Sequence, residues 1–141
     1  MIRSPDRRRF HSVLAVLAML LLVCYFAGAW FVQSYLIADI NGDGARDAIL
    51  LVWKRGSYGR HKPSWVERDD AGLTQHVFIY SEREDGSWYP IWMSSRTGLG
   101  IRRMRLGPEI PGLSRPSLVF DGRDGETRWG WLSWGLMRLD E

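Results

Sequence analysis

The hydrophobic pattern changes once along the chain, close to residue 32. Before that point there is a long apolar stretch, and no charged residue lies between Arg9 and Asp39. After it come short runs of Val, Ile, Leu, Tyr and Trp, separated by clusters of Gly, Asp and Pro. No later run keeps a helical period for three turns, and such short runs are typical of strands. The pattern predicts one N-terminal helix followed by a mostly β domain.

Eight strands are expected in the second part of the chain, at about residues 32–38, 47–54, 74–82, 87–94, 101–106, 116–121, 126–132 and 134–139. The clearest hairpin joins residues 76–82 to 87–93 through a turn that contains Asp85 and Gly86, a dipeptide typical of tight hairpin turns. A similar turn at residues 121–125 joins the sixth and seventh strands. Consecutive hairpins predict a small antiparallel β-meander, closed as a barrel or folded over as a sandwich.

The N-terminal apolar segment predicts a transmembrane helix. Its core from Val13 to Phe31 approaches the roughly 20 residues that cross about 30 Å of hydrocarbon. Arginines before the segment favour a cytoplasmic N-terminus, and Trp30 at the far end suits the opposite interface. We therefore expect residues 1–10 to be a basic cytoplasmic head, residues 11–31 a transmembrane signal-anchor, and residues 32–141 an extracytoplasmic β domain of a single-pass membrane protein.

A cleaved signal peptide is the alternative for the same segment. The basic start, the apolar middle and the small residues Ala27, Gly28 and Ala29 are typical of one, and a cut after Ala29 would leave a secreted domain. The apolar run continues through Trp30 and Phe31, which favours retention. Both interpretations place the domain outside the cytoplasm.

Charge and cysteine usage narrow the classes of partner. Residues 1–10 carry four arginines and one aspartate, so the totals of 19 basic and 16 acidic residues leave 15 of each from residue 11 onward. A neutral domain lacks the basic footprint of a nucleic-acid binder, and no nucleic-acid partner is expected. The single cysteine, Cys24, excludes an intramolecular disulfide.

Residues 39–47 have the spacing of a calcium loop. Oxygen-bearing side chains stand at loop positions 1, 3, 5 and 9, and glycine at position 6 suits a sharp turn. Calcium takes six to eight oxygen ligands, which alternate residues of a tight loop can supply. The expected ligands are the side chains of Asp39, Asn41, Asp43 and Asp47 and the carbonyl of Ala45. The alternative is a polar hairpin turn, because Asn, Gly and Asp also form turns.

The flanks of the loop indicate its type. An EF-hand needs a ligand at position 12 and a following helix, whereas Leu50 occupies that position within an apolar run. Strand, loop and strand over about 20 residues resemble the calcium-binding segment of FG-GAP or VCBS-type repeats, found in integrin α-chain propellers and many bacterial surface proteins. The resemblance implies the same five ligands. The tandem copies of a propeller, which needs at least about four blades, are missing.

A second candidate site lies in the long connection after residue 55. Tyr58, His61, Lys62 and Trp65 suit a glycan, cell-envelope component or anionic headgroup, while the alternatives are a solvated loop and, for most tryptophans, core packing. No reaction signature is present, so no enzyme activity is expected. The leading hypothesis is a membrane-anchored, non-catalytic module with a structural calcium loop. The alternatives are a glycan-binding module and an accessory subunit that meets a membrane-protein partner through its apolar helix.

Overall fold

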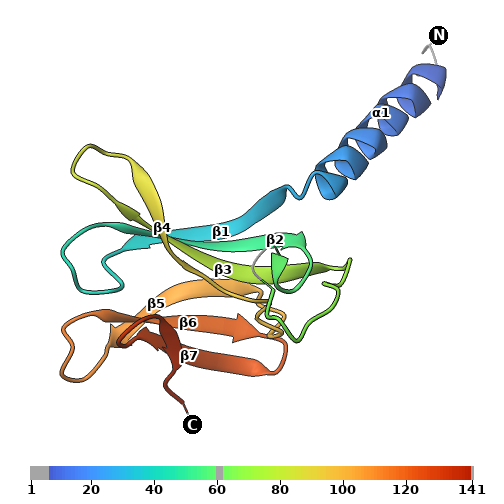
Figure 1. Cartoon of the computed structure of the whole chain (residues 1–141). Helices are drawn as coiled ribbons and strands as arrows, with labels where there is room; N and C mark the ends of the chain where they lie inside the picture. The colour runs from blue at the N-terminus through green and yellow to red at the C-terminus, as the bar shows by residue number, and fades with distance from the viewer. Residues whose placement is uncertain (1–6, 60–61, 141) are drawn as a thin grey trace.

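The chain folds into two four-stranded antiparallel sheets that face each other, with one helix outside them (Figure 1). The computed structural model describes residues 7–59 and 62–140. Helix α1 spans Arg7–Phe26. The first sheet contains β1 (Trp30–Ala38), β2 (Asp47–Arg55), β3 (Leu73–Glu82) and β4 (Trp88–Met93). The second contains β5 (Arg103–Glu109), β6 (Pro116–Gly122), β7 (Gly125–Trp131) and β8 (Leu136–Arg138).

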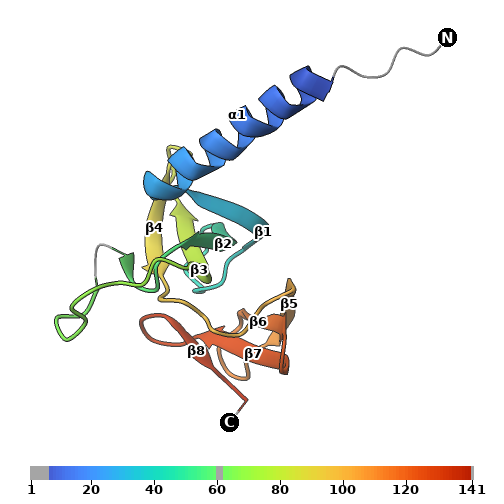
Figure 2. The same cartoon turned by 90° about the vertical axis from the view of Figure 1, so that its right-hand side faces the viewer.

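The predicted antiparallel meander is confirmed, and it takes the sandwich form. Strand order in each sheet follows chain order, and every neighbouring pair is antiparallel. Each expected strand lies within a few residues of an observed one. The two sheets stack as separate layers, which is clearest in Figures 1 and 2. The chain therefore makes two consecutive meanders rather than one closed barrel.

Alternation along the central strands builds the core between the layers. Ile49 and Ile79 are fully buried and lie opposite each other on β2 and β3, and Leu118 of the second sheet belongs to the same cluster. Burying each such side chain contributes about 1.5–3 kcal/mol. With no disulfide available, this shared core holds the two sheets together.

A polar network fixes the first sheet to the start of the second. The Gln75 side chain is buried in β3, where its Oε1 accepts the Ile101 N–H at 2.7 Å and its Nε2 donates to the Ile101 carbonyl at 2.7 Å. Gln33 lies at the bulge of β1, where the register with β2 shifts. Its Oε1 accepts hydrogen bonds from Gln75 Nε2 at 2.7 Å and Trp53 Nε1 at 2.8 Å. The network gives the backbone of Ile101 the partners that a neighbouring strand would give.

The prediction of a transmembrane helix is wrong for this structure. No helix in the described ranges combines the length and the apolar character that crossing a bilayer demands. The expected span is divided, because α1 ends at Phe26 and Gly28 takes a positive φ of 73°. Trp30 and Phe31 then belong to β1, paired with Lys54 and Trp53. The helical part of the apolar run, residues 13–26, is about 21 Å long at 1.5 Å per residue, short of the hydrocarbon thickness of about 30 Å.

The localisation built on that helix is corrected with it. A single-pass membrane protein, with a cytoplasmic N-terminus, a signal-anchor at residues 11–31 and a C-terminal domain outside, is not supported by the structure. Residues 1–6 of the predicted cytoplasmic head lie outside the described residues. The hypothesis of an accessory subunit recruited by a membrane span loses its basis for the same reason. Cleavage after Ala29 is a separate question of processing, which the fold does not test.

Candidate functional site

The candidate calcium loop connects β1 to β2 at the end of the sandwich remote from α1 (Figure 1). The pairing of Ala38 with Asp47 closes the loop at its base. Gly42 and Gly44 have φ values of 78° and 85°. Glycine adopts this left-handed conformation without the steric cost that a side chain brings. These glycines let the chain curl around the first carboxylate of the loop.

The carboxylate of Asp39 lies at the centre of the loop. Its Oδ1 accepts the N–H groups of Gly42 at 2.7 Å and Asp43 at 3.1 Å, and its Oδ2 accepts the N–H of Gly44 at 2.8 Å. Three backbone amides thus point at one carboxylate. This arrangement satisfies amides that have no strand partner, and it also concentrates negative charge inside the loop.

Asn41 and Asp43 each accept the backbone N–H of the residue two positions further along the chain. Asn41 Oδ1 accepts the Asp43 N–H at 2.9 Å, and Asp43 Oδ1 accepts the Ala45 N–H at 2.8 Å. Asn41 Nδ2 also donates to Asp43 Oδ2 at 2.9 Å. The side chains of Asn41 and Asp43 are therefore in contact, and Asp39 shares the Asp43 N–H with Asn41.

Asp47 differs from the other loop residues because it is fully buried. Its Oδ2 accepts the Ile40 N–H at 2.9 Å, whereas neither its Oδ1 nor the hydroxyl of Ser81, which is paired with Asp47 across β3, forms a hydrogen bond of ordinary geometry. Burial raises the pKa of the Asp47 carboxyl, an effect that Ser81 and the Ile40 amide partly offset and that the charge of Asp43 reinforces. A buried carboxylate oxygen without a partner is costly. A cation next to Asp47 would remove that cost.

Acceptor capacity remains on all four side chains. A carboxylate offers about four lone-pair positions and an amide oxygen two. Asp39 uses three, Asn41 one, Asp43 two and Asp47 one. Across residues 7–59 and 62–140, however, no three His, Cys, Asp or Glu side chains gather into a metal-ligand group. The loop has oxygen atoms that can act as calcium ligands. Binding of calcium would require its carboxylates to move closer together.

The guanidinium of Arg115, from the second sheet, also contacts the loop, and no local pattern in the sequence predicts this contact. Arg115 Nη1 donates to the Asn41 carbonyl, and Nη2 donates to the Leu132 carbonyl at 3.2 Å. Gly42 packs against the same side chain, since a Cβ there would lie 3.4 Å from Arg115 Cδ. Arg115 thereby ties the loop to two turns of the other sheet. Only the stacking of the sheets brings residues 74 positions apart into contact.

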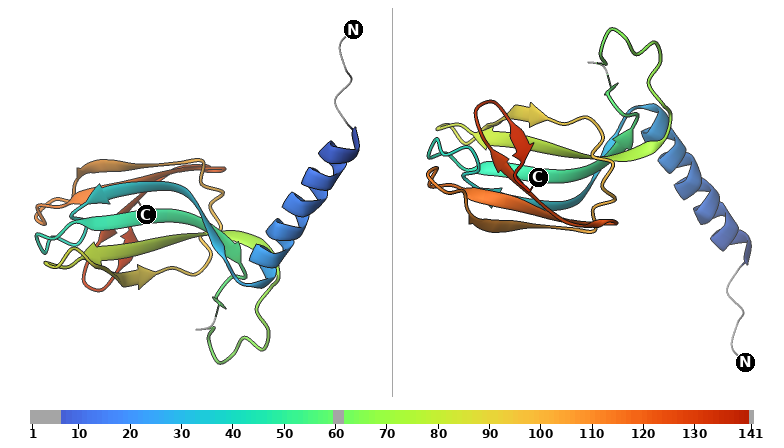
Figure 3. Two further views of the ribbon diagram at one scale, coloured as in Figure 1. Left: turned by 90° about the horizontal axis from the view of Figure 1, so that it is seen from above. Right: turned by 90° about the horizontal axis from the view of Figure 1, so that it is seen from below.

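The second candidate site lies at the opposite end of the sandwich, near the junction of α1 and β1 (Figure 3). Trp65 is 82% exposed and Tyr58 is 39% exposed. Lys62 Nζ donates to the Val66 carbonyl, so its ammonium is used within the connection. His61 lies outside the described residues. The two predicted sites are therefore separate, and no common centre forms from them.

Asp69 organises this connection, and sequence reasoning missed it. Its carboxylate accepts the backbone N–H groups of Ser57 at 2.8 Å and Gly59 at 2.7 Å, with Tyr58 between them at 3.2 Å. Although burial alone raises the pKa of Asp69, these amides together hold its pKa below the ordinary value. The ends of the connection are thus closed by one side chain, which leaves Trp65 projecting.

The remaining tryptophans divide between core and surface. Trp92, Trp129 and Trp131 pack against the hydrophobic core, which is three of the seven tryptophans after residue 32 rather than the majority that was expected. Trp134, in the turn before β8, is 74% exposed. Large aromatic rings that pack in a core contribute stability, whereas exposed rings are available for contacts.

Comparisons with known proteins add no assignment: no protein-family model, no curated protein and no solved structure matches the chain.

Proposed function

We propose that the chain is a non-catalytic β module whose loop at residues 39–47 binds one calcium ion that stabilises the fold. The observation that carries this proposal is Asp47, a fully buried carboxylate at the base of the loop with one oxygen that has no partner. The bond from the Ile40 N–H occupies only one oxygen of this buried carboxylate. A divalent cation beside the other oxygen would balance the buried charge.

The remaining ligands come from the same loop. Asp39, Asn41 and Asp43 supply side-chain oxygens, Ala45 supplies its carbonyl, and Asp47 supplies the oxygen that has no partner. Oxygen donors of this kind, three of them carboxylates, suit calcium because it is a hard cation with flexible geometry. The resemblance of the segment to FG-GAP or VCBS-type calcium loops implies the same set.

The expected gain in stability is modest. Extracellular calcium modules bind with a Kd of about 10⁻⁴ to 10⁻³ M. At a Kd of about 10⁻⁴ M, about 2 mM calcium adds roughly 2 kcal/mol to the free energy of unfolding. For a domain of this size that change raises the Tm by several degrees.

The first test is a thermal melt of the full chain in about 2 mM calcium and in excess EDTA, with Asp47→Asn alongside. Asparagine keeps an oxygen for the Ile40 N–H and removes the buried charge. We expect the wild-type Tm to rise by several degrees with calcium. The variant should melt at or above the wild type in EDTA, because a neutral group is cheaper to bury, and should not respond to calcium.

Asp124→Asn is the matched control, since it removes one carboxylate from the exposed β6–β7 turn. This variant should keep the full calcium response. A wild-type Tm that is equal in both buffers would show that residues 39–47 form only a turn. A calcium response retained by Asp47→Asn would equally contradict the proposed ligand set.

A glycan-binding module is the second candidate, favoured by the 82% exposure of Trp65 on a connection that Asp69 holds in place. An exposed indole offers an apolar face on which sugar rings stack. Trp65→Ala should abolish retardation of the chain in gels that contain a purified envelope polysaccharide. The control is Trp134→Ala, which removes an indole of similar exposure at the other end of the sandwich. Equal retardation of both variants and the wild type would reject this candidate.

A further inference from the structure

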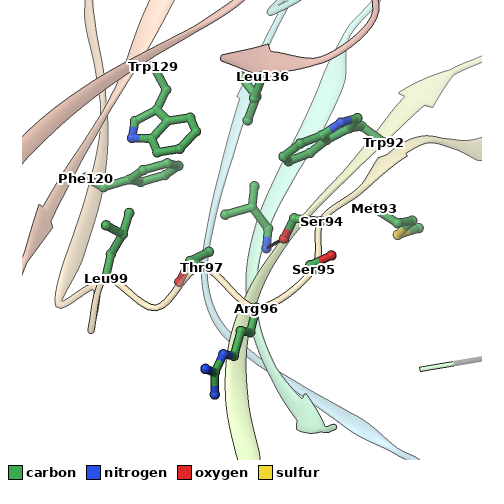
Figure 4. A pocket seen from close by; sticks show the side chains of 11 residues that line it. Trp92, Met93, Ser94, Ser95, Arg96, Thr97, Leu99, Phe120, Trp129 and Leu136 are labelled. Carbon is green, nitrogen blue, oxygen red and sulfur yellow. Dashed lines mark hydrogen bonds between the residues drawn. The ribbon is translucent and has the colours of Figure 1, made fainter. Parts of the chain in front are cut away.

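A cavity of about 350 Å³ opens between the two sheets along the edge formed by β4 and β8 (Figure 4). Its walls come from both layers and from the segment that links them, residues 94–99. The side chains that turn toward its centre are mainly apolar: Trp92, Leu99, Phe120, Trp129 and Leu136. None of these positions belongs to the calcium loop or to the connection that carries Trp65.

The aromatic walls are held in place by their surroundings. Phe120 and Trp129 pack with ring centroids 6.1 Å apart and planes tilted by 52°. Trp92 lies against the turn before β8, where a Cβ on Gly135 would come within 2.5 Å of its Nε1. Only glycine at this point leaves room for the indole. The cavity is therefore bounded by rings that have little freedom to collapse into it.

Three polar groups of the lining are bonded within the protein or buried. Trp129 Nε1 donates to Thr127 Oγ1 at 2.9 Å, and Ser94 Oγ accepts the Val77 N–H at 2.8 Å. Thr97 Oγ1 has no hydrogen-bond partner but is itself buried. The Arg96 side chain points away from the aromatic cluster in Figure 4. Beside the aromatic cluster an occupant would meet ring faces and aliphatic groups, whereas the exposed residues Ser95 and Arg96 complete the lining.

We propose that this cavity binds a small, neutral, predominantly aromatic or aliphatic molecule. An apolar cavity of about 150 Å³ is enough for benzene, and ligand pockets begin at about 300 Å³. A cavity of about 350 Å³ accordingly suits a molecule of two or three fused rings. An anionic ligand of the same shape is disfavoured beside the aromatic rings, because its charge would lose water there and the Arg96 side chain is directed away from them.

The test is calorimetric titration of the full chain at neutral pH with 2-naphthol, which is neutral, and with 2-naphthoate, which carries a carboxylate on the same rings. We expect saturable binding of 2-naphthol and at least about tenfold weaker binding of 2-naphthoate. Nuclear Overhauser contacts between 2-naphthol and the Trp92 and Trp129 rings should accompany binding.

Leu99→Trp fills the cavity, and Leu106→Trp adds the same indole on the exposed part of β5. The first variant should weaken 2-naphthol binding at least about tenfold, and the second should leave it unchanged. Both variants retain α1, so binding to that apolar helix is the same in each. Absence of saturable binding, equal binding of the two naphthalene ligands, or contacts to protons other than those of the cavity would overturn the proposal. The contacts in wild type decide the matter even if Leu99→Trp fails to fold.

Discussion

At the scale of single residues, His76 is the buried titratable group outside the two candidate sites. It is fully buried in β3, with Nδ1 3.0 Å from the Ser94 carbonyl and Nε2 3.0 Å from the Gly56 carbonyl. Burial lowers its pKa below the ordinary value of 6.5, and the charge of Lys54 adds to this. The two carbonyls and Asp69 oppose the shift without reversing it. The folded protein therefore takes up a proton at this imidazole less readily than the unfolded chain does.

This gives a pH dependence with a definite sign. Below about pH 6.5 the unfolded chain takes up a proton at His76, whereas the folded chain resists it, so the free energy of unfolding falls as the pH is lowered. We expect urea unfolding to show lower stability at about pH 5 than at about pH 7.5. The His76→Gln variant should lose part of this difference. An identical pH dependence in wild type and variant would contradict the lowered pKa.

At the scale of elements, the bulge in β1 and the link between the sheets are held by side chains rather than by strand pairing. Gln75 accepts the Ile101 N–H and donates to the Ile101 carbonyl, which also accepts from Gln33 Nε2 at 3.2 Å. Gln33 Oε1 accepts the Trp53 indole N–H. Such side-chain pairs are sensitive to truncation, because loss of one member leaves buried polar groups without partners.

Gln75→Leu tests this arrangement. Leucine has a similar size but cannot bond to Ile101, so the buried Ile101 N–H loses its partner and the Ile101 carbonyl keeps only the bond from Gln33 Nε2 at 3.2 Å. We expect a loss of about 2–4 kcal/mol in the free energy of unfolding by urea denaturation. Gln33→Ala, which leaves the Gln75 bonds to Ile101 in place, should cost clearly less. A Gln75→Leu variant as stable as the wild type would show that the network contributes nothing.

At the scale of the whole molecule, strand direction decides what lies together. β1 runs from α1 to the candidate calcium loop, so that loop and the 56–72 connection occupy opposite ends (Figures 1 and 3). The second meander brings the Arg115 side chain into contact with the loop. It also places Phe120 and Trp129 in the wall of the cavity that Trp92 lines from the first sheet. Calcium binding, glycan binding and occupation of the cavity are for this reason separable by the variants given for each.

The strands were predictable because their signals are local. Alternating apolar residues and turn dipeptides such as Asp85-Gly86 act over a few positions, and they marked all eight strands and both hairpin turns. The convergence of Asp39, Asn41 and Asp43 was equally local, since the loop backbone alone brings them together. Calcium binding by this loop stays a prediction, which the thermal melts in calcium and in EDTA test.

Sequence alone determined the class of fold, the hairpins and the composition of the loop, because each depends on neighbours along the chain. Tertiary structure decided that the sheets form a sandwich, that Asp47 is buried, and that Arg115 reaches the loop. It also decided where the apolar N-terminal run stops being helical, since pairing of Trp30 and Phe31 with β2 competes with continuation of α1. These outcomes depend on contacts between distant segments, which no local pattern encodes.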